Sequence, residues 1–90
     1  MILKNGERLV FAGGSVTAAG RRPYPLGEAQ GDLGNGYVHI IKNMLDAWYP
    51  ELNILITNAG VDGNTSRDLL ARFQRDVLDL HPQWFSICIG

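Results

Sequence analysis

The sequence has few of the features that would assign it at once to a large class of proteins. Its 90 residues contain one cysteine, Cys88, which excludes an internal disulfide and a zinc site built from several cysteines. Eight basic and nine acidic side chains leave a net charge of -1, so no nucleic acid or membrane partner is expected. No apolar stretch approaches the ~20 residues of a membrane-spanning helix. Residues 1–6 turn polar too early for a signal peptide, so we expect a cytoplasmic protein.

What is present is a globular composition, with 46% apolar and 19% charged residues. Apolar segments rich in β-branched and aromatic residues predict strands at 8–12, 52–57 and 84–89, buried on both faces of a parallel sheet. Apolar spacings of three and four residues predict a helix over 37–48 and another from Thr65 or Ser66 to about Leu80. The order β-α-β-α-β predicts a three-layer, flavodoxin-like α/β fold.

The helical patterns also predict which side chains face the sheet. The apolar stripes are Tyr37, Ile41, Met44 and Trp48 in the first helix, and Leu70, Phe73, Val77 and Leu80 in the second. The predicted polar positions are His39, Lys42, Asn43 and Asp46 in the first helix, and the pairs Asp68/Arg72, Arg72/Asp76 and Arg75/Asp79 in the second. We expect these pairs to be solvated surface ion pairs.

Ser15 is the strongest candidate for chemistry. Ligands of parallel sheets bind at the carboxyl ends of the strands, and Ser15 follows the first strand and two glycines there. The alternative is a serine that only caps a turn. Residues 18–36 are rich in glycine and proline, and predict a long loop over this crevice, as a functional lid or a mobile segment.

Four segments together resemble the SGNH hydrolases, the GDSL esterase/lipase family. Residues 10–17, Val-Phe-Ala-Gly-Gly-Ser-Val-Thr, resemble its first block, an apolar strand followed by Gly-Asp-Ser-hydrophobic-Thr. Residues 33–38 resemble the entry to its first helix, and 58–65 its second block. Residues 87–90 look like the start of the third block, Gly-x-Asn. The chain is therefore expected to be a single partial domain over 1–90, truncated at the third block.

The resemblance implies hydrolysis of acyl esters. Ser15 would attack the ester carbonyl and form an acyl-enzyme, and the backbone N–H groups of Ser15 and Gly60 would hold the oxyanion. The resemblance also implies that Gly14, Asn64 and Gly90 line the substrate site, that no cofactor or metal is needed, and that the substrate is a small or carbohydrate ester of a short acyl group such as acetyl. A turn glycine with positive φ is a further interpretation of Gly60.

The sequence departs from the family pattern in two places. Gly14 stands where aspartate is usual, and the chain ends at Gly90, before the third-block asparagine and the distal Asp-x-x-His that supplies the base. No other group is predicted to replace that base. The other titratable candidates are His39 (polar helix face), His81 (helix end), Asp62 (solvated loop) and Cys88 (buried packing). We therefore expect the parent protein to be the esterase and the chain alone to be inactive.

Two other functions remain open. One is a partial domain that only binds or assembles. The other is a nucleotide-binding module, faintly suggested by Gly13-Gly14-Ser15 and Gly20, although no G-x-G-x-x-G is present. Whichever holds, the uncovered sheet edge beside the third strand predicts self-association.

Overall fold

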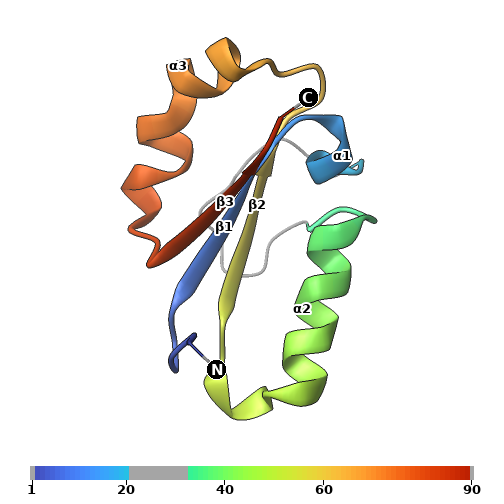
Figure 1. Ribbon diagram of the computed structural model, residues 1–90, viewed down its shortest axis with the longest axis vertical. Coiled ribbons are helices and arrows are strands. Elements are labelled where there is room, and N and C mark those ends of the chain that lie inside the picture. The colour runs from blue at the N-terminus through green and yellow to red at the C-terminus, as the bar shows by residue number, and fades with distance from the viewer. Residues whose placement is uncertain (1, 21–32, 90) are drawn as a thin grey trace.

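The computed structural model describes residues 2–20 and 33–89 (Figure 1). Its elements are β1 (Arg8–Gly13), α1 (Ser15–Ala18), α2 (Tyr37–Trp48), η1 (Pro50–Leu52), β2 (Leu55–Gly60), α3 (Ser66–Asp76), η2 (Leu78–Leu80) and β3 (Trp84–Cys88), where η is a 3-10 turn. The predicted order of strands and helices is confirmed, with α1 as an addition. The predicted loop over the crevice falls mainly on residues 21–32, outside the described residues.

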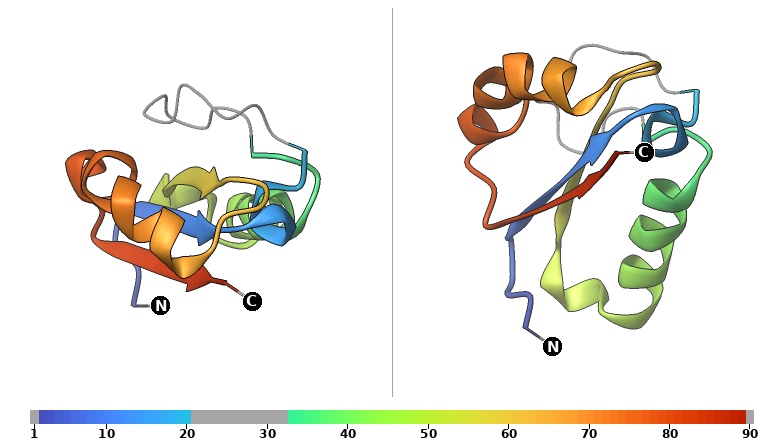
Figure 2. Two further views of the ribbon diagram at one scale, coloured as in Figure 1. Left: turned by 90° about the horizontal axis from the view of Figure 1, so that it is seen from above. Right: turned by 45° about the horizontal axis from the view of Figure 1, so that its top comes forward.

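The sheet is parallel, with β1 in the centre and the order β2-β1-β3. Gly13 at the end of β1 is in register with Gly60 of β2 and Cys88 of β3, so the strands end at the same level. Helix α2 lies on one face of the sheet and α3 on the other (Figures 1 and 2). This is the predicted three-layer α/β architecture.

Each face of the sheet has its own apolar core, because the side chains of β1 alternate between the faces. Val10 and Ala12 pack with Leu69 and Val77 from the α3 side. Phe11 points the other way, into a cluster with Val38 of α2 and with Ile54 and Ile56 around β2. Both clusters are buried, so the central strand is fixed from two sides.

Strand β2 begins later than the sequence predicts. The predicted start was Leu52, but Pro50–Leu52 form a 3-10 turn and Asn53 adopts a left-handed conformation with φ 49°. The strand proper starts at Leu55. The apolar character of Leu52 and Ile54 comes from packing against the α2 core, which a turn can supply as well as a strand.

The N-terminus of α3 is where the sequence predicts it. Thr65 is the N-cap and forms a capping box with Asp68: Thr65 Oγ1 accepts from the Asp68 N–H, and the Thr65 N–H donates to Asp68 Oδ2 at 2.9 Å. The hydrogen bond from that backbone N–H, with help from the Thr65 hydroxyl, lowers the pKa of Asp68.

The predicted stripes are confirmed at Tyr37, Ile41, Phe73, Val77 and Leu80, which pack on the two cores, and are wrong at three positions. In α3, Leu69 is 4% exposed and Leu70 is 76% exposed, so Leu69 replaces Leu70 in the core. In α2, Met44 and Trp48 are exposed, whereas Lys42 is buried and its Nζ donates to Asp46 Oδ1 and to the Ile54 carbonyl. A lysine can be buried this way because its stem packs on the sheet while its ammonium finds oxygen acceptors.

Among the described residues, no helix has the length and apolar character needed to cross a bilayer.

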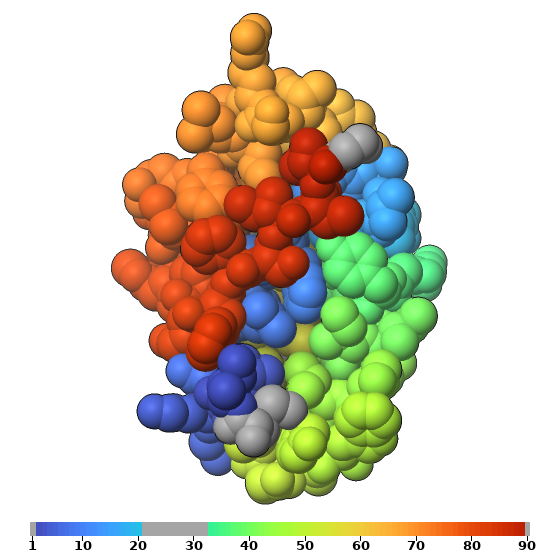
Figure 3. Space-filling view, viewed as in Figure 1, coloured from blue at the N-terminus to red at the C-terminus, as the bar shows by residue number. Residues whose placement is uncertain are grey.

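Strand β3 is exposed along its whole length, contrary to the predicted burial on both faces. Trp84, Phe85 and Ile87 are 39%, 49% and 49% exposed, and Cys88, predicted as buried packing, is exposed as well. The cause is its position: β3 is an edge strand, and no further element of the described chain covers it. Figure 3 shows this strand, in red, across the surface of the molecule.

Candidate active site at the carboxyl ends of the strands

Ser15 lies at the carboxyl edge of the sheet, as the first residue of α1. It is exposed, and its Oγ has no hydrogen-bond partner among the described residues. It borders a hollow of about 140 Å³ lined by Gly14, Ser15, Val16, Cys88 and Ile89. Specific small-molecule sites usually measure roughly 300–1,000 Å³, so these residues form one wall of a site rather than a whole one.

The two glycines before Ser15 have different reasons to be glycine. A Cβ on Gly13 would collide with the Cys88 carbonyl and lie 2.6 Å from Thr17 Oγ1. A Cβ on Gly14 would meet only the Asn64 carbonyl, at an ordinary 3.5 Å. Gly13 therefore allows β1 and β3 to close on α1, whereas position 14 has room for a side chain such as the aspartate of the family pattern.

The N–H of Gly60, the predicted second oxyanion donor, is already hydrogen-bonded within the protein. Its N–H donates to Asn58 Oδ1 at 2.9 Å, and both residues are buried. A Cβ at this position would collide with the Ala18 N and lie 2.9 Å from the Thr17 carbonyl carbon. The role of Gly60 as an oxyanion donor stays a prediction, since its N–H is engaged by Asn58 here. The position requires glycine because α1 packs directly on it, and Gly60 is not among the residues with positive φ.

The loop after β2 brings Asn64 next to the Ser15 turn. The Val61 N–H donates to the Gly13 carbonyl at 3.0 Å, which ties this loop to β1. Asn64 Oδ1, however, accepts from Arg72 Nε at 2.7 Å, so this oxygen is engaged by α3. Asp62 is exposed, as predicted. Gly90 is outside the described residues, although its neighbour Ile89 borders the hollow at Ser15.

The ion pairs of α3 are not the solvated surface pairs that their spacing predicts. The side chain of Asp76 is 1% exposed; it accepts from Arg72 Nη1 at 3.0 Å and from Arg75 Nε at 2.6 Å. Arg72 is itself largely buried, and its Nη2 also reaches the Gly13 carbonyl at 3.4 Å. Asp79 accepts from Gln74 instead of Arg75. Spacing alone cannot predict this burial, because i,i+4 spacing is the same on both faces of a helix.

Removing the buried arginine is expected to cost more stability than removing the exposed one. Arg72→Met should lower the free energy of unfolding by about 2 kcal/mol, because the buried Asp76 carboxylate then keeps only part of its compensating charge. The Arg75 side chain is 65% exposed, so Arg75→Met should lower the free energy of unfolding by less than about 1 kcal/mol. Urea unfolding of the two variants measures the difference. Equal losses would show that the Arg72–Asp76 pair is not the buried cross-link described here.

Neither histidine has a hydrogen bond to Ser15 in the described part of the chain. His39 is exposed on α2. His81 ends the η2 turn in a left-handed conformation, at the start of β3, so the full strand separates it from Ser15 at about 3.3 Å per residue. Within the described ranges, no group of three or more His, Cys, Asp or Glu residues could hold a metal ion. The pKa of Glu7 is lowered, chiefly by the Lys4 N–H, but Glu7 does not border the hollow at Ser15.

The short helix α1, which no sequence pattern predicts, carries the candidate nucleophile. It has four residues, too few for a periodic pattern, and no side chain caps its N-terminus. Its Thr17 Oγ1 lies 2.6 Å from Tyr37 Oη, and its Thr17 carbonyl accepts from Asn58 Nδ2 at 2.7 Å. The helix is thus held mainly from outside, by side chains of α2 and β2.

The chain is similar to known esterases. No protein-family model matches it. It is 48% identical over 91 residues to an acetylxylan esterase from Geobacillus stearothermophilus, a match that covers 100% of this chain and 41% of that protein. The chain thus spans about two fifths of the length of this relative. A crystal structure of the esterase superposes with a TM-score of 0.91 at 47% identity, over the same shares of the two chains.

A second solved structure is similar as well. LAE5, described as an alpha/beta hydrolase enzyme from the metagenome of Lake Arreo, superposes with a TM-score of 0.89 at 41% identity, over 97% of this chain and 40% of that one. Three solved forms of the Geobacillus esterase are described as catalytic mutants, with a serine, an aspartate or a histidine replaced by alanine. The serine variant is S15A. The aspartate and histidine lie beyond the part of that protein matched by this chain.

Proposed function

We propose that this chain is the nucleophile-bearing part of an SGNH-type serine esterase that removes acetyl groups from carbohydrate esters. The observation that carries the proposal is the position of Ser15: it is exposed, its Oγ has no hydrogen-bond partner among the described residues, and as the first residue of α1 it follows β1 and Gly14 at the level where the strands end. The similarity to an acetylxylan esterase supports the acetyl group and the carbohydrate as the two halves of the substrate.

In the proposed reaction, Ser15 Oγ attacks the acetyl carbonyl carbon and the sugar hydroxyl leaves. The acetyl-serine is then hydrolysed by water to acetate and free serine. The Ser15 N–H is proposed as an oxyanion donor, because an N–H at the first position of a helix has no intrahelical acceptor. The Gly60 N–H would join it only after leaving Asn58 Oδ1. Gly14, Asn64 and Gly90 are proposed to border the substrate, with Gly14 giving it the closest backbone approach.

The general base is proposed to lie outside the described residues. A serine hydroxyl is a weak nucleophile near neutral pH without a base, and within the described residues neither His39 nor His81 has a hydrogen bond to Ser15. In the Geobacillus esterase, the aspartate and histidine of the catalytic mutants belong to the unmatched part. We also propose a cytoplasmic location, which the unpaired cysteine supports.

The test joins this chain at Gly90 to the unmatched remainder of the Geobacillus esterase and compares the joined protein with the chain alone. The joined protein should release acetate from acetylated xylo-oligosaccharides, and the chain alone should not. A folded but inactive joined protein would favour the alternative of a partial domain that only binds or assembles.

The dinucleotide-binding alternative gains no support, because β1 leads into a four-residue helix instead of the long helix of such sites.

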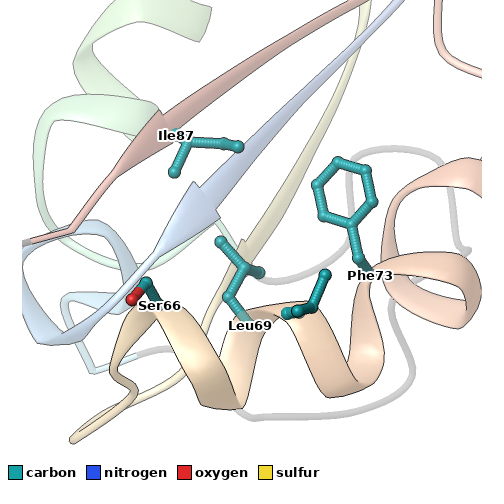
Figure 4. A pocket seen from close by; sticks show the side chains of 5 residues that line it. Ser66, Leu69, Phe73 and Ile87 are labelled. Carbon is teal, nitrogen blue, oxygen red and sulfur yellow. The ribbon is translucent and has the colours of Figure 1, made fainter.

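The open edge at β3 is proposed as a self-association surface of the chain when it stands alone. No strand of the described chain pairs with its outer edge, and an apolar groove of about 260 Å³ runs between Ile87 and the α3 residues Ser66, Leu69, Leu70 and Phe73 (Figure 4). Exposed apolar edges of this kind pair with a second copy. The exposed apolar side chains of β3 and the backbone groups of its outer edge together favour pairing with a second copy of the chain.

The apparent mass of the chain in sedimentation or light scattering is therefore expected to rise with concentration. Ile87→Lys should return it to a monomer, because a charge at the centre of the groove opposes pairing. Ile40→Lys is the matched control: Ile40 is 57% exposed on α2, far from this edge, and its replacement should leave the association unchanged. If the unsubstituted chain stays monomeric at all concentrations, the proposal is contradicted.

A further inference from the structure

Asn58 makes more hydrogen bonds around the site than any pattern in the sequence indicates. It lies on β2, is 3% exposed, and uses both amide hydrogens and its carbonyl oxygen. Nδ2 donates to the Thr17 carbonyl at 2.7 Å and to the Leu33 carbonyl at 2.8 Å. Oδ1 accepts from the Gly60 N–H at 2.9 Å. One buried side chain therefore joins α1, the segment that leads to α2, and the end of β2.

The helix that carries Ser15 depends on such external bonds. Its own backbone bonds are those of the Ala18 and Ala19 N–H groups to the Gly14 and Ser15 carbonyls, at 2.9 and 2.8 Å. A single helical turn is not stable by itself, since nucleation fixes several residues for few hydrogen bonds. The Thr17 carbonyl that Asn58 holds is only two residues from Ser15, so its position determines where Ser15 Oγ lies.

We infer that Asn58 is a positioning residue, which holds α1 so that Ser15 faces the ester carbonyl. The inference rests on the proposed function and adds a residue to it. Asn58 touches neither the hollow at Ser15 nor any reacting atom in the proposed reaction. Its effect on catalysis runs through Thr17 and α1, and through the Gly60 N–H that it engages. A misplacement of about 1 Å can cost on the order of 100-fold in rate.

The first test replaces Asn58 in the joined protein by aspartate, which has the same shape. At high pH the carboxylate would oppose the two carbonyl oxygens that Asn58 now bonds, and kcat should fall by about 10- to 100-fold with KM nearly unchanged. Burial and these carbonyls disfavour the charged form, so the pKa of the introduced carboxyl is raised. The protonated acid can again donate to one carbonyl and accept from Gly60. The ratio of variant to parent kcat should therefore rise as pH falls.

Thr57→Val provides the matched control. Thr57 is the neighbouring residue of β2, is equally buried, and its Oγ1 has no hydrogen-bond partner among the described residues. Its replacement should change kcat by less than about twofold and should leave the pH profile as in the parent. If Asn58 only stabilised β2, the ratio of Asn58→Asp kcat to parent kcat would likewise not change with pH.

A second measurement does not depend on activity. Hydrogen exchange of the α1 peptide in the joined protein should be at least about tenfold faster in Asn58→Ala than in Thr57→Val, because α1 then opens locally. Parent-like kcat and exchange in the Asn58 variants, with Ser15→Ala inactive, would overturn the inference and leave the proposed function standing. A folded parent without esterase activity would overturn the proposed function, and the exchange rates would still decide whether Asn58 holds α1.

Discussion

Ser15→Ala in the joined protein is expected to abolish deacetylation, with a loss on the order of 10⁴- to 10⁶-fold in kcat. The reason is chemical: without Oγ no acyl-enzyme can form, and the residual rate comes from binding and the oxyanion donor alone. Ser15 is exposed and its Oγ has no partner among the described residues, so the stability of the fold should hardly change. Release of acetate from acetylated xylo-oligosaccharides measures the loss, and thermal unfolding verifies the fold.

Ser66→Ala is the matched control for this prediction. Ser66 is also exposed and also occupies the first position of a helix, α3, but it lies in the groove beside β3. Its replacement should leave kcat within about twofold of the parent, since it removes an exposed hydroxyl that does not border the hollow at Ser15. Comparable losses in both variants, or appreciable activity in Ser15→Ala, would rule out Ser15 as the nucleophile.

Gly60→Ala is expected to destabilise the fold by roughly 3 kcal/mol or more. Its new Cβ would meet the backbone of Ala18 and Thr17, and a backbone cannot rotate away as a side chain can. To make room, α1 would have to lift off the end of β2 and lose the contacts that hold it there. The free energy of unfolding, measured in urea, gives the magnitude.

Gly14→Ala is the control, because this position is close to Gly60 in the site but open. Its Cβ would lie 3.5 Å from the Asn64 carbonyl, an ordinary contact, and its φ is -96°. The change in the free energy of unfolding should stay within about 1 kcal/mol. A mild effect at Gly60, or a large one at Gly14, would mean that α1 does not pack against β2 as described.

Periodicity and turn chemistry were enough to predict most of the framework. The first and third strands, the exact span of α2 and the Thr65 cap of α3 were predicted correctly because each depends on local sequence. The start of β2 was not, since Leu52 and Ile54 are apolar for the sake of the α2 core and not for a strand. Local pattern cannot separate those two causes.

Burial was harder to predict than the elements themselves. The spacing of Arg72 and Asp76 is that of a surface pair, and only the packing of α3 on β1 shows that Asp76 is buried. The exposure of β3 depends on what lies beside the strand, which its own residues do not encode. Cys88 was misassigned for the same reason.

The candidate site was predictable in part. Ser15 and Gly14 could be found because a strand followed by glycines places the next residue at the ligand-binding edge. The role of Asn58 could not, since its partners lie 41, 25 and 2 residues away in the sequence and all are backbone groups. Such contacts leave no pattern of side-chain types. Gly60 was singled out as an oxyanion donor or a turn glycine, and the close packing of α1 on it is visible only in the structure.

The most direct test of the account is to label the joined protein with an acetyl-like phosphonate ester and to locate the adduct by peptide mass spectrometry. The reagent reacts only with a serine that a base has activated. One adduct is expected, on the peptide that contains Ser15, and no adduct is expected on the 90-residue chain alone. An adduct on another serine of the joined protein, or equal labelling of Ser15 in the chain alone, would contradict it.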